Sequence, residues 1–79
     1  MVLKQAKSLV KGQWIYDSTL SVNGTPARFK VYGKIKLWKR DPTKIRVPLK
    51  RGLREHDYLT ENNLNHFFLT EQEAKENQQ

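Results

Sequence analysis

The segment from Ala27 to Arg40 constrains the fold more than any other part of the chain. Its odd-numbered positions up to residue 37 are apolar or small, whereas its even-numbered positions are basic or aromatic. Side chains alternate between the two faces of a β-strand, so this pattern predicts a strand with one buried face and one solvent-exposed face. Fourteen extended residues would span about 46 Å, which is too long for one straight strand in a small domain. We therefore expect the strand to bend at Gly33.

Length and composition limit what such a chain can be. A chain of 79 residues, 37% of them hydrophobic, has room for one domain with a thin core and no large catalytic cavity. It contains no cysteine, which excludes disulfides and a Cys-ligated zinc site. No apolar run approaches the roughly 18 residues of a membrane span, and the first residues lack a signal-peptide core. We expect an intracellular, cytoplasmic protein that does not contact a membrane.

The dipeptide Asn23-Gly24 predicts a hairpin with a two-residue turn, because both residues tolerate a positive φ angle. On the apolar face of the hairpin this turn would pair Val22 with Thr25, Leu20 with Ala27, Ser18 with Phe29, Tyr16 with Val31, and Trp14 with Gly33. On the solvent face it would place Asp17 across from Lys30 and Ile15 across from Tyr32. We therefore predict that Trp14 and Tyr16 belong to the core.

A second hairpin is predicted around Asp41-Pro42-Thr43, because Asp and Pro both favour turns. Its register would bring Trp38 within cation–π reach of Arg46 and would pair Leu37 with Val47 and Ile35 with Leu49. Pro48 indicates that the strand over residues 44–50 lies at a sheet edge or is bulged there. Arg51-Gly52 predicts a further tight turn, and the register of the strand after it is left open.

The two ends of the chain carry weaker helical patterns. Residues 1–11 are expected to form an arm or a short helix. Residues 61–64 are predicted to form a single helical turn after Thr60, followed by a short strand over residues 66–69. One helix over residues 61–69 is the alternative. Thr70 and Glu73 form a capping box, so residues 70–79 are expected to be an acidic tail or a short helix.

These elements predict an all-β fold, mainly strands with one short helical turn, over residues 12–69. A Lys-Gly pair before the first strand, two or more hairpins, a single helical turn and a final short strand occur in an order that resembles small SH3-like barrels. A five-stranded OB-like barrel is the alternative. The resemblance is to a fold that hosts many functions, and it implies no particular activity.

Charge is the strongest functional signal in the sequence. The formal net charge is +7, and between residues 28 and 54 eleven residues are basic and only Asp41 is acidic. Such segregation favours a polyanionic partner, and exposed aromatic rings beside Lys and Arg can stack unpaired bases. We predict a small basic nucleic-acid-binding protein, with DNA and RNA both open. Its expected site residues are Arg28, Lys30, Tyr32, Lys34, Lys36, Trp38, Arg40 and Arg46.

Two other possibilities are weighed against nucleic-acid binding. The same face could dock an acidic protein surface, which would make the chain a non-catalytic interaction module or accessory subunit. Catalysis is not expected, because His56 and Asp57 are adjacent in a predicted strand and would point to opposite faces. No metal-ligand spacing, phosphate loop or nucleophile motif is present, so we expect no cofactor and no small-molecule substrate. The oligomeric state is open.

Overall fold

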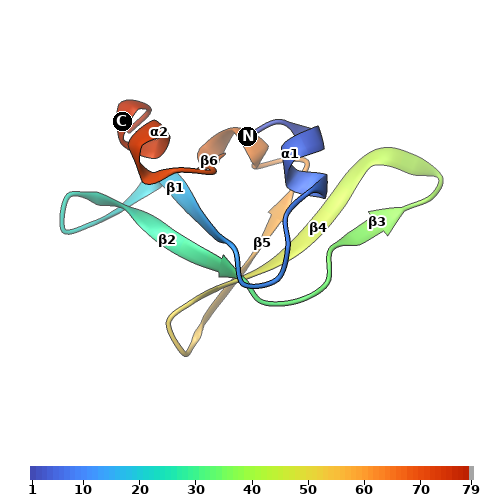
Figure 1. The fold of residues 1–79 in the computed structure, drawn as a ribbon, viewed down its shortest axis with the longest axis horizontal. Helices are drawn as coiled ribbons and strands as arrows, with labels where there is room; N and C mark the ends of the chain where they lie inside the picture. Colours follow the sequence, from blue (N-terminus) through green and yellow to red (C-terminus); the bar gives the residue numbers. More distant parts are fainter. Residues whose placement is uncertain (79) are drawn as a thin grey trace.

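The structure is a computed structural model that describes residues 1–78. It is an antiparallel β fold with two short α-helices, as the sequence predicts (Figure 1). Its overall dimensions are 40 × 26 × 17 Å. In chain order the elements are α1 (Leu3–Lys7), β1 (Trp14–Val22), β2 (Thr25–Val31), β3 (Lys36–Trp38), β4 (Asp41–Arg51), β5 (Glu55–Thr60), the 3-10 helix η1 (Leu64–His66), β6 (Phe67–Phe68) and α2 (Glu71–Glu76).

The long strand β4 is the centre of the sheet. Arg46 is paired with Lys36 of β3 and also with Thr60 of β5, so these two strands lie on opposite edges of β4. Lys50 is likewise paired with β2 and with β5, so β2 and β3 share one edge. β1 follows β2, and β6 follows β1. Within residues 1–78 no ladder joins β5 to β6, so strand pairing does not show the closed barrel of the SH3-like or OB-like comparison.

The predicted long strand is present but interrupted. β2 and β3 follow one another along the same edge of β4, and residues 32–35 leave the ladder between them. The N–H of Tyr32 donates to the carbonyl of Pro48 at 3.2 Å, and the return bond of such a pair would need an N–H that proline lacks. A Cβ at Gly33 would lie 3.0 Å from Cγ of Pro48. The break is therefore set by Pro48. The prediction that Pro48 lies at an edge or in a bulge of its strand is wrong, because β4 is central and its ladder with β5 passes through Pro48 without a register shift. The extra residues lie in the facing segment, residues 32–35.

The first hairpin has the predicted turn but a different register. Asn23 and Gly24 both have positive φ, and Val22 is paired with Thr25. Beyond the turn the register shifts, because residues 18–20 bulge out of β1. The carboxylate of Asp17 accepts the N–H of Thr19 at 2.8 Å and its hydroxyl at 2.7 Å, which holds the bulge.

The shift reverses the faces that we predicted for β1. Trp14 is paired with Lys30 and Tyr16 with Arg28, on the solvent face. Ile15 is paired with Phe29 and is fully buried. The prediction that Trp14 and Tyr16 are core residues is therefore wrong, and so are the pairs of Trp14 with Gly33, Tyr16 with Val31, Ser18 with Phe29, Leu20 with Ala27, Asp17 with Lys30 and Ile15 with Tyr32.

The second hairpin is also shifted in register. Its turn lies at residues 39–40 rather than 41–43, and Leu37 is paired with Ile45 rather than Val47. The pairs predicted for Ile35 and Trp38 are wrong for the same reason, since Trp38 lies opposite Asp41. The third hairpin has a three-residue turn over residues 52–54, which pairs Leu59 with Val47 in the core and turns His56 outward.

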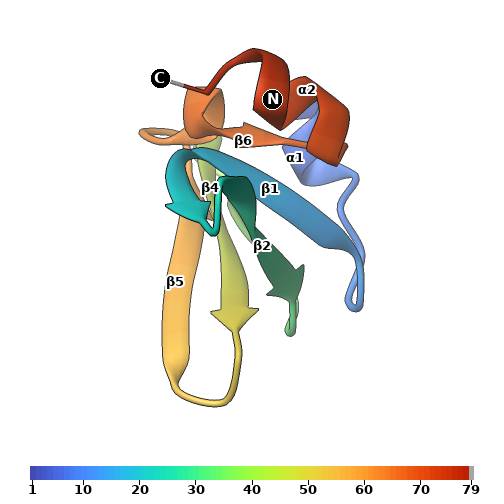
Figure 2. The same ribbon diagram turned by 90° about the vertical axis from the view of Figure 1, so that its left-hand side faces the viewer.

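The core lies between the sheet and a layer made by α1, η1, β6 and α2. Figure 2 shows these elements together on one side, with β2, β4 and β5 extending away from them. Phe29 and Phe67 meet edge to face at 5.8 Å, and Ala6 and Leu9 close the core from the α1 side. Of the two forms predicted for residues 1–11, an arm or a short helix, the structure contains the short helix, α1.

Residues 61–69 form the predicted helical turn and short strand rather than one helix, although the turn lies at residues 64–66. After β6 Thr70 caps α2 as predicted, although the carboxylate of Glu73 accepts from the hydroxyl of Thr70 and not from its backbone N–H, as a full capping box requires. The hydroxyl of Thr70 accepts the N–H of Glu73 at 3.2 Å and donates to its carboxylate at 3.0 Å, and α2 follows. Gln79 lies outside the described residues.

Candidate nucleic-acid interface

The solvent face of the sheet is arranged in rows, because paired residues on neighbouring strands point to the same side. We call this surface the outer face. The first row joins Tyr16 and Arg28. The rows that follow along β4 are Trp14, Lys30, Lys50 and His56; then Pro48 with Tyr58, next to Tyr32; then Lys36, Arg46 and Thr60; and finally Trp38 with its partner Asp41, beside Lys44.

Aromatic rings and cations alternate along this face. The guanidinium of Arg28 lies 3.9 Å from the ring centre of Trp14. At the other end of the face, the ammonium groups of Lys36 and Lys44 each lie 4.9 Å from the ring of Trp38. Between these two sites Arg46 lies 5.2 Å from the ring of Tyr58. Each contact keeps a cation beside an aromatic face, as stacking platforms for nucleic acid do.

Like charges face one another across the strands. Lys30 is opposite Lys50, and Lys36 is opposite Arg46. Within these rows Asp41, which is paired with Trp38, is the one acidic residue among the described residues. Directly opposed like charges destabilise a sheet. These pairs therefore lower the free energy of unfolding unless a ligand supplies negative charge. Within residues 1–78 the only salt bridges are Arg51 with Glu55 and an i,i+4 pair in α2, and neither involves a residue of the rows.

The predicted site residues fall into two groups. Six of them lie together on the outer face: Arg28, Lys30, Tyr32, Lys36, Trp38 and Arg46. The other two are exposed but lie outside the strands, Lys34 in the interruption after β2 and Arg40 in the turn before β4. The predicted contact of Trp38 with Arg46 is replaced by its contacts with Lys36 and Lys44.

The sequence analysis did not assign several residues of the outer face to the site, among them Trp14, Tyr16, Lys44, Lys50, His56 and Tyr58. His56 contacts the ring of Tyr32 edge to face at 5.3 Å. An available signal was the Asp-Ser-Thr triplet at residues 17–19, since Asp readily bonds the backbone two residues on and so disturbs a strand. A register shifted by this triplet turns Trp14 outward.

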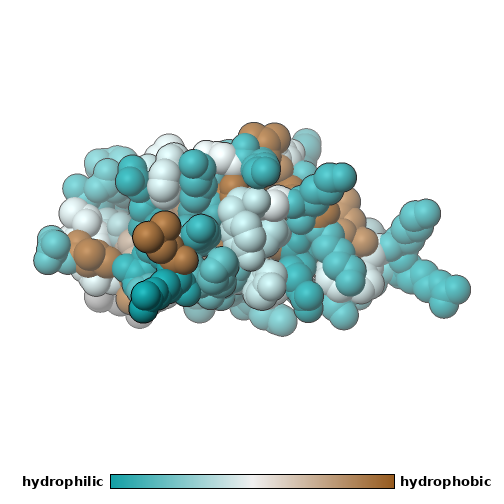
Figure 3. Space-filling view, turned by 90° about the horizontal axis from the view of Figure 1, so that it is seen from below, coloured by the Kyte–Doolittle hydropathy of each residue, from teal (hydrophilic) through white to brown (hydrophobic). Residues whose placement is uncertain are grey.

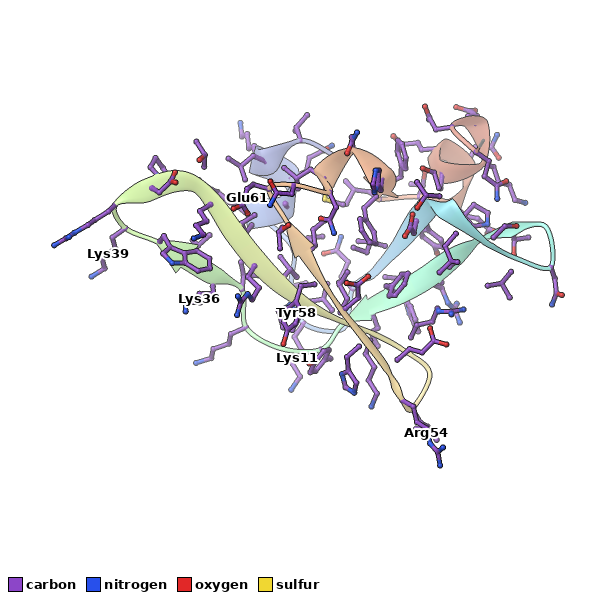
Figure 4. All side chains as sticks on the ribbon, turned by 180° about the vertical axis from the view of Figure 1, so that it is seen from behind. Lys11, Lys36, Lys39, Arg54, Tyr58 and Glu61 are labelled. Carbon is purple, nitrogen blue, oxygen red and sulfur yellow. The ribbon has the colours of Figure 1, made fainter. Side chains whose placement is uncertain are left out.

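Further basic side chains extend from the tips of the hairpins. Figure 4 shows Lys39 at the turn between β3 and β4, and Arg54 at the turn between β4 and β5. Tyr58 and Lys36 lie between these tips, whereas Glu61 lies at the opposite end of β5 from Arg54. Seen from the side opposite the helices, the surface is mostly hydrophilic and its hydrophobic residues are separated from one another (Figure 3).

A shallow pocket of about 330 Å³ opens at the Trp14 end of the face. It is lined by Trp14, Lys30, Tyr32, Lys50, Gly52 and Leu53. A second hollow of about 300 Å³ lies beside Trp38 and is lined by Lys7 of α1, Leu37, Trp38, Lys39, Pro42 and Lys44. The first hollow therefore combines an indole ring with two lysines, and the second combines one with three.

Among residues 1–78 no group of three His, Asp or Glu side chains is placed to hold a metal ion. His56 and Asp57 lie in different rows of the sheet, opposite Lys50 and Leu49. None of the helices within residues 1–78 is long and apolar enough to cross a membrane.

The fold lowers the pKa of the N-terminal amino group of Met1 by burial, and it lowers the pKa of Asp41 by hydrogen bonding. The hydroxyl of Thr43 donates to its carboxylate at 2.6 Å and lowers the pKa, and the backbone N–H of Thr43 adds to this effect. This bonding repeats the arrangement of Asp17 and Thr19 in β1.

Comparisons of the chain with models of protein families, with curated proteins and with solved structures found no match. The function proposed below is argued from the residues of the outer face alone.

Proposed function

We propose that the chain is a small, non-catalytic nucleic-acid-binding protein that holds backbone phosphates on its outer face. The observation that carries this proposal is that like charges are paired across the strands, Lys30 with Lys50 and Lys36 with Arg46, on a face whose described rows contain one acidic residue, Asp41. A polyanion would neutralise both pairs, and released counterions would add to the affinity. An acidic protein surface is the alternative partner, and the experiment below separates the two.

The test uses the opposite effects that these lysines should have on folding and on binding. We expect Lys30→Gln to leave the free energy of unfolding unchanged or to raise it by up to about 1 kcal/mol, because a like-charge pair is removed. The same change should weaken binding to a mixed-sequence oligonucleotide. It should also reduce the log–log salt slope by about one, since one phosphate contact is lost.

Lys4→Gln is the matched control, because it removes the same charge from an exposed position on α1, away from the sheet rows. Its salt slope should equal that of the unchanged protein. Affinity would be measured by fluorescence anisotropy at several salt concentrations, and stability by urea unfolding. Equal effects of the two substitutions, or no binding at low salt, would remove the proposal. Failure to bind would direct attention to an acidic protein partner, whose complex should outlast moderate salt.

A further inference from the structure

We infer that the nucleic acid is single-stranded and that its bases stack at two separate platforms, one at each end of the outer face. This inference rests on the proposed function and adds to it the class of nucleic acid and the place of the bases. The Trp14 platform is the pocket lined by Trp14, Tyr32 and Leu53 between Lys30 and Lys50. The Trp38 platform is the indole between Lys36 and Lys44.

The Trp14 platform has the composition of a nucleotide site. The pocket has a volume of about 330 Å³. Its apolar walls are the indole of Trp14, the phenol ring of Tyr32 and the side chain of Leu53, and Lys30 and Lys50 lie at its side. Leu53 is 88% exposed at the tip of the β4–β5 turn, although apolar side chains are ordinarily covered. A base lying against Trp14 would cover Leu53, while its phosphate would meet the two lysines.

Cations contact the indole ring at both platforms, Arg28 and Lys30 at Trp14. At the Trp38 platform these cations are Lys36 and Lys44. Both lysines are exposed, so the approach of a phosphate can draw their ammonium groups away from the indole and leave it open for a base. The exchange replaces a cation–π contact by a charge-assisted bond to phosphate, which is the stronger of the two.

The distance between the platforms sets the length of the bound strand. Lys50 lines the first and Lys44 flanks the second, and six residues of β4 separate them by about 20 Å. A stacked strand advances about 3.4 Å per nucleotide, so roughly six nucleotides reach from one platform to the other, and fewer suffice for an extended strand. In a duplex the faces of the bases are already stacked on their neighbours. The two platforms therefore favour an unpaired strand.

The experiment compares an octathymidylate with an abasic strand of the same number of phosphates. Trp14→Leu and Trp38→Leu remove each platform, and Trp14→Phe and Trp38→Phe keep an aromatic face as matched controls. We expect each Leu variant to weaken octathymidylate binding by roughly 5- to 150-fold, the effect of one stacked base, and to leave abasic binding nearly unchanged. The Phe variants should retain most of the affinity. A dinucleotide, which cannot reach both platforms, should be insensitive to at least one of the Leu variants.

The outcomes separate this inference from the proposed function. If octathymidylate and the abasic strand bind equally well and lose affinity with salt alike, the face binds phosphates and the platforms do not stack bases. The inference also fails if a duplex of the same length binds more tightly than the single strand. If neither strand binds at low salt, both the inference and the proposed function fail. Circular dichroism and urea unfolding of each variant show whether a lost affinity reflects a lost fold.

Discussion

At the scale of single residues, two Asp-x-Thr triplets form the same local hydrogen bonds. In residues 17–19 and in residues 41–43 the aspartate carboxylate accepts both the backbone N–H and the hydroxyl of the threonine two residues later. Each triplet lies where a ladder changes register, in β1 and at the start of β4. The bonding replaces hydrogen bonds that the ladder would otherwise provide, which is why a register counted from turn length alone fails beyond it.

The second triplet gives a prediction about pH. The hydroxyl of Thr43 is the main cause of the lowered pKa of Asp41. A carboxyl whose pKa is lower in the folded than in the unfolded protein adds stability above its ordinary value of 3.8, and this stability is lost as pH falls through the folded value. We expect Thr43→Val to raise the pKa of Asp41, whereas Thr43→Ser should leave it low. Carbon-detected NMR titration of the Asp41 carboxyl measures this pKa in both variants. Equal pKa values in the two variants would contradict the role given to the Thr43 hydroxyl.

At the scale of elements, the interruption between β2 and β3 depends on one proline and one glycine. A methyl group at Gly33 would lie 3.0 Å from Cγ of Pro48, closer than side chains tolerate without movement. We expect Gly33→Ala to lower the free energy of unfolding by about 1–3 kcal/mol, the usual cost of overpacking. In a Pro48→Ala background the same change should cost less, because the ring that it strikes is gone.

A double-mutant cycle by urea unfolding measures this coupling. A Gly33→Ala change that costs less in the Pro48→Ala background would support this explanation. Additive effects would mean that Gly33 is needed for a reason other than its approach to Pro48. Neither substitution changes the charge of the protein. Each variant that retains the fold should therefore retain salt-dependent oligonucleotide binding. A loss of binding in a stable Gly33→Ala variant would show that the bend positions the outer face.

The sequence predicts the elements better than their registers. Alternation over residues 27–40, Asn23-Gly24 and the Thr70–Glu73 box act locally, and the structure contains each corresponding element. Register depends on where a ladder bulges, and a bulge over residues 18–20 exchanges the faces of Trp14 and Ile15. Five of the eight predicted site residues share the outer face because they belong to one alternating segment, and Arg46 joins them from β4. The partners on β1 and β5 could not be identified without the pairing of distant strands.

At the scale of the whole molecule, charge is divided between two sides. The outer face and the tips of the β3–β4 and β4–β5 hairpins are basic, whereas α2 contains Glu71, Glu73 and Glu76 and packs on β1, β2 and β6. This arrangement separates two quantities that are often treated as one, the net charge of the protein and the number of phosphates that it contacts. The salt dependence of binding reports the second, because only phosphates in contact release their counterions.

Replacing both Glu71 and Glu76 by Gln tests this distinction. The change raises the formal net charge from +7 by two without touching the outer face or the Thr70–Glu73 cap. We expect a log–log salt slope equal to that of the unchanged protein, and a gain in affinity that is small at 0.1 M salt, where the Debye length is about 10 Å. Lys30→Gln changes the net charge by only one and should nevertheless alter the slope. A slope that follows net charge in both variants would mean that the protein attracts polyanions as a whole, without a defined binding face.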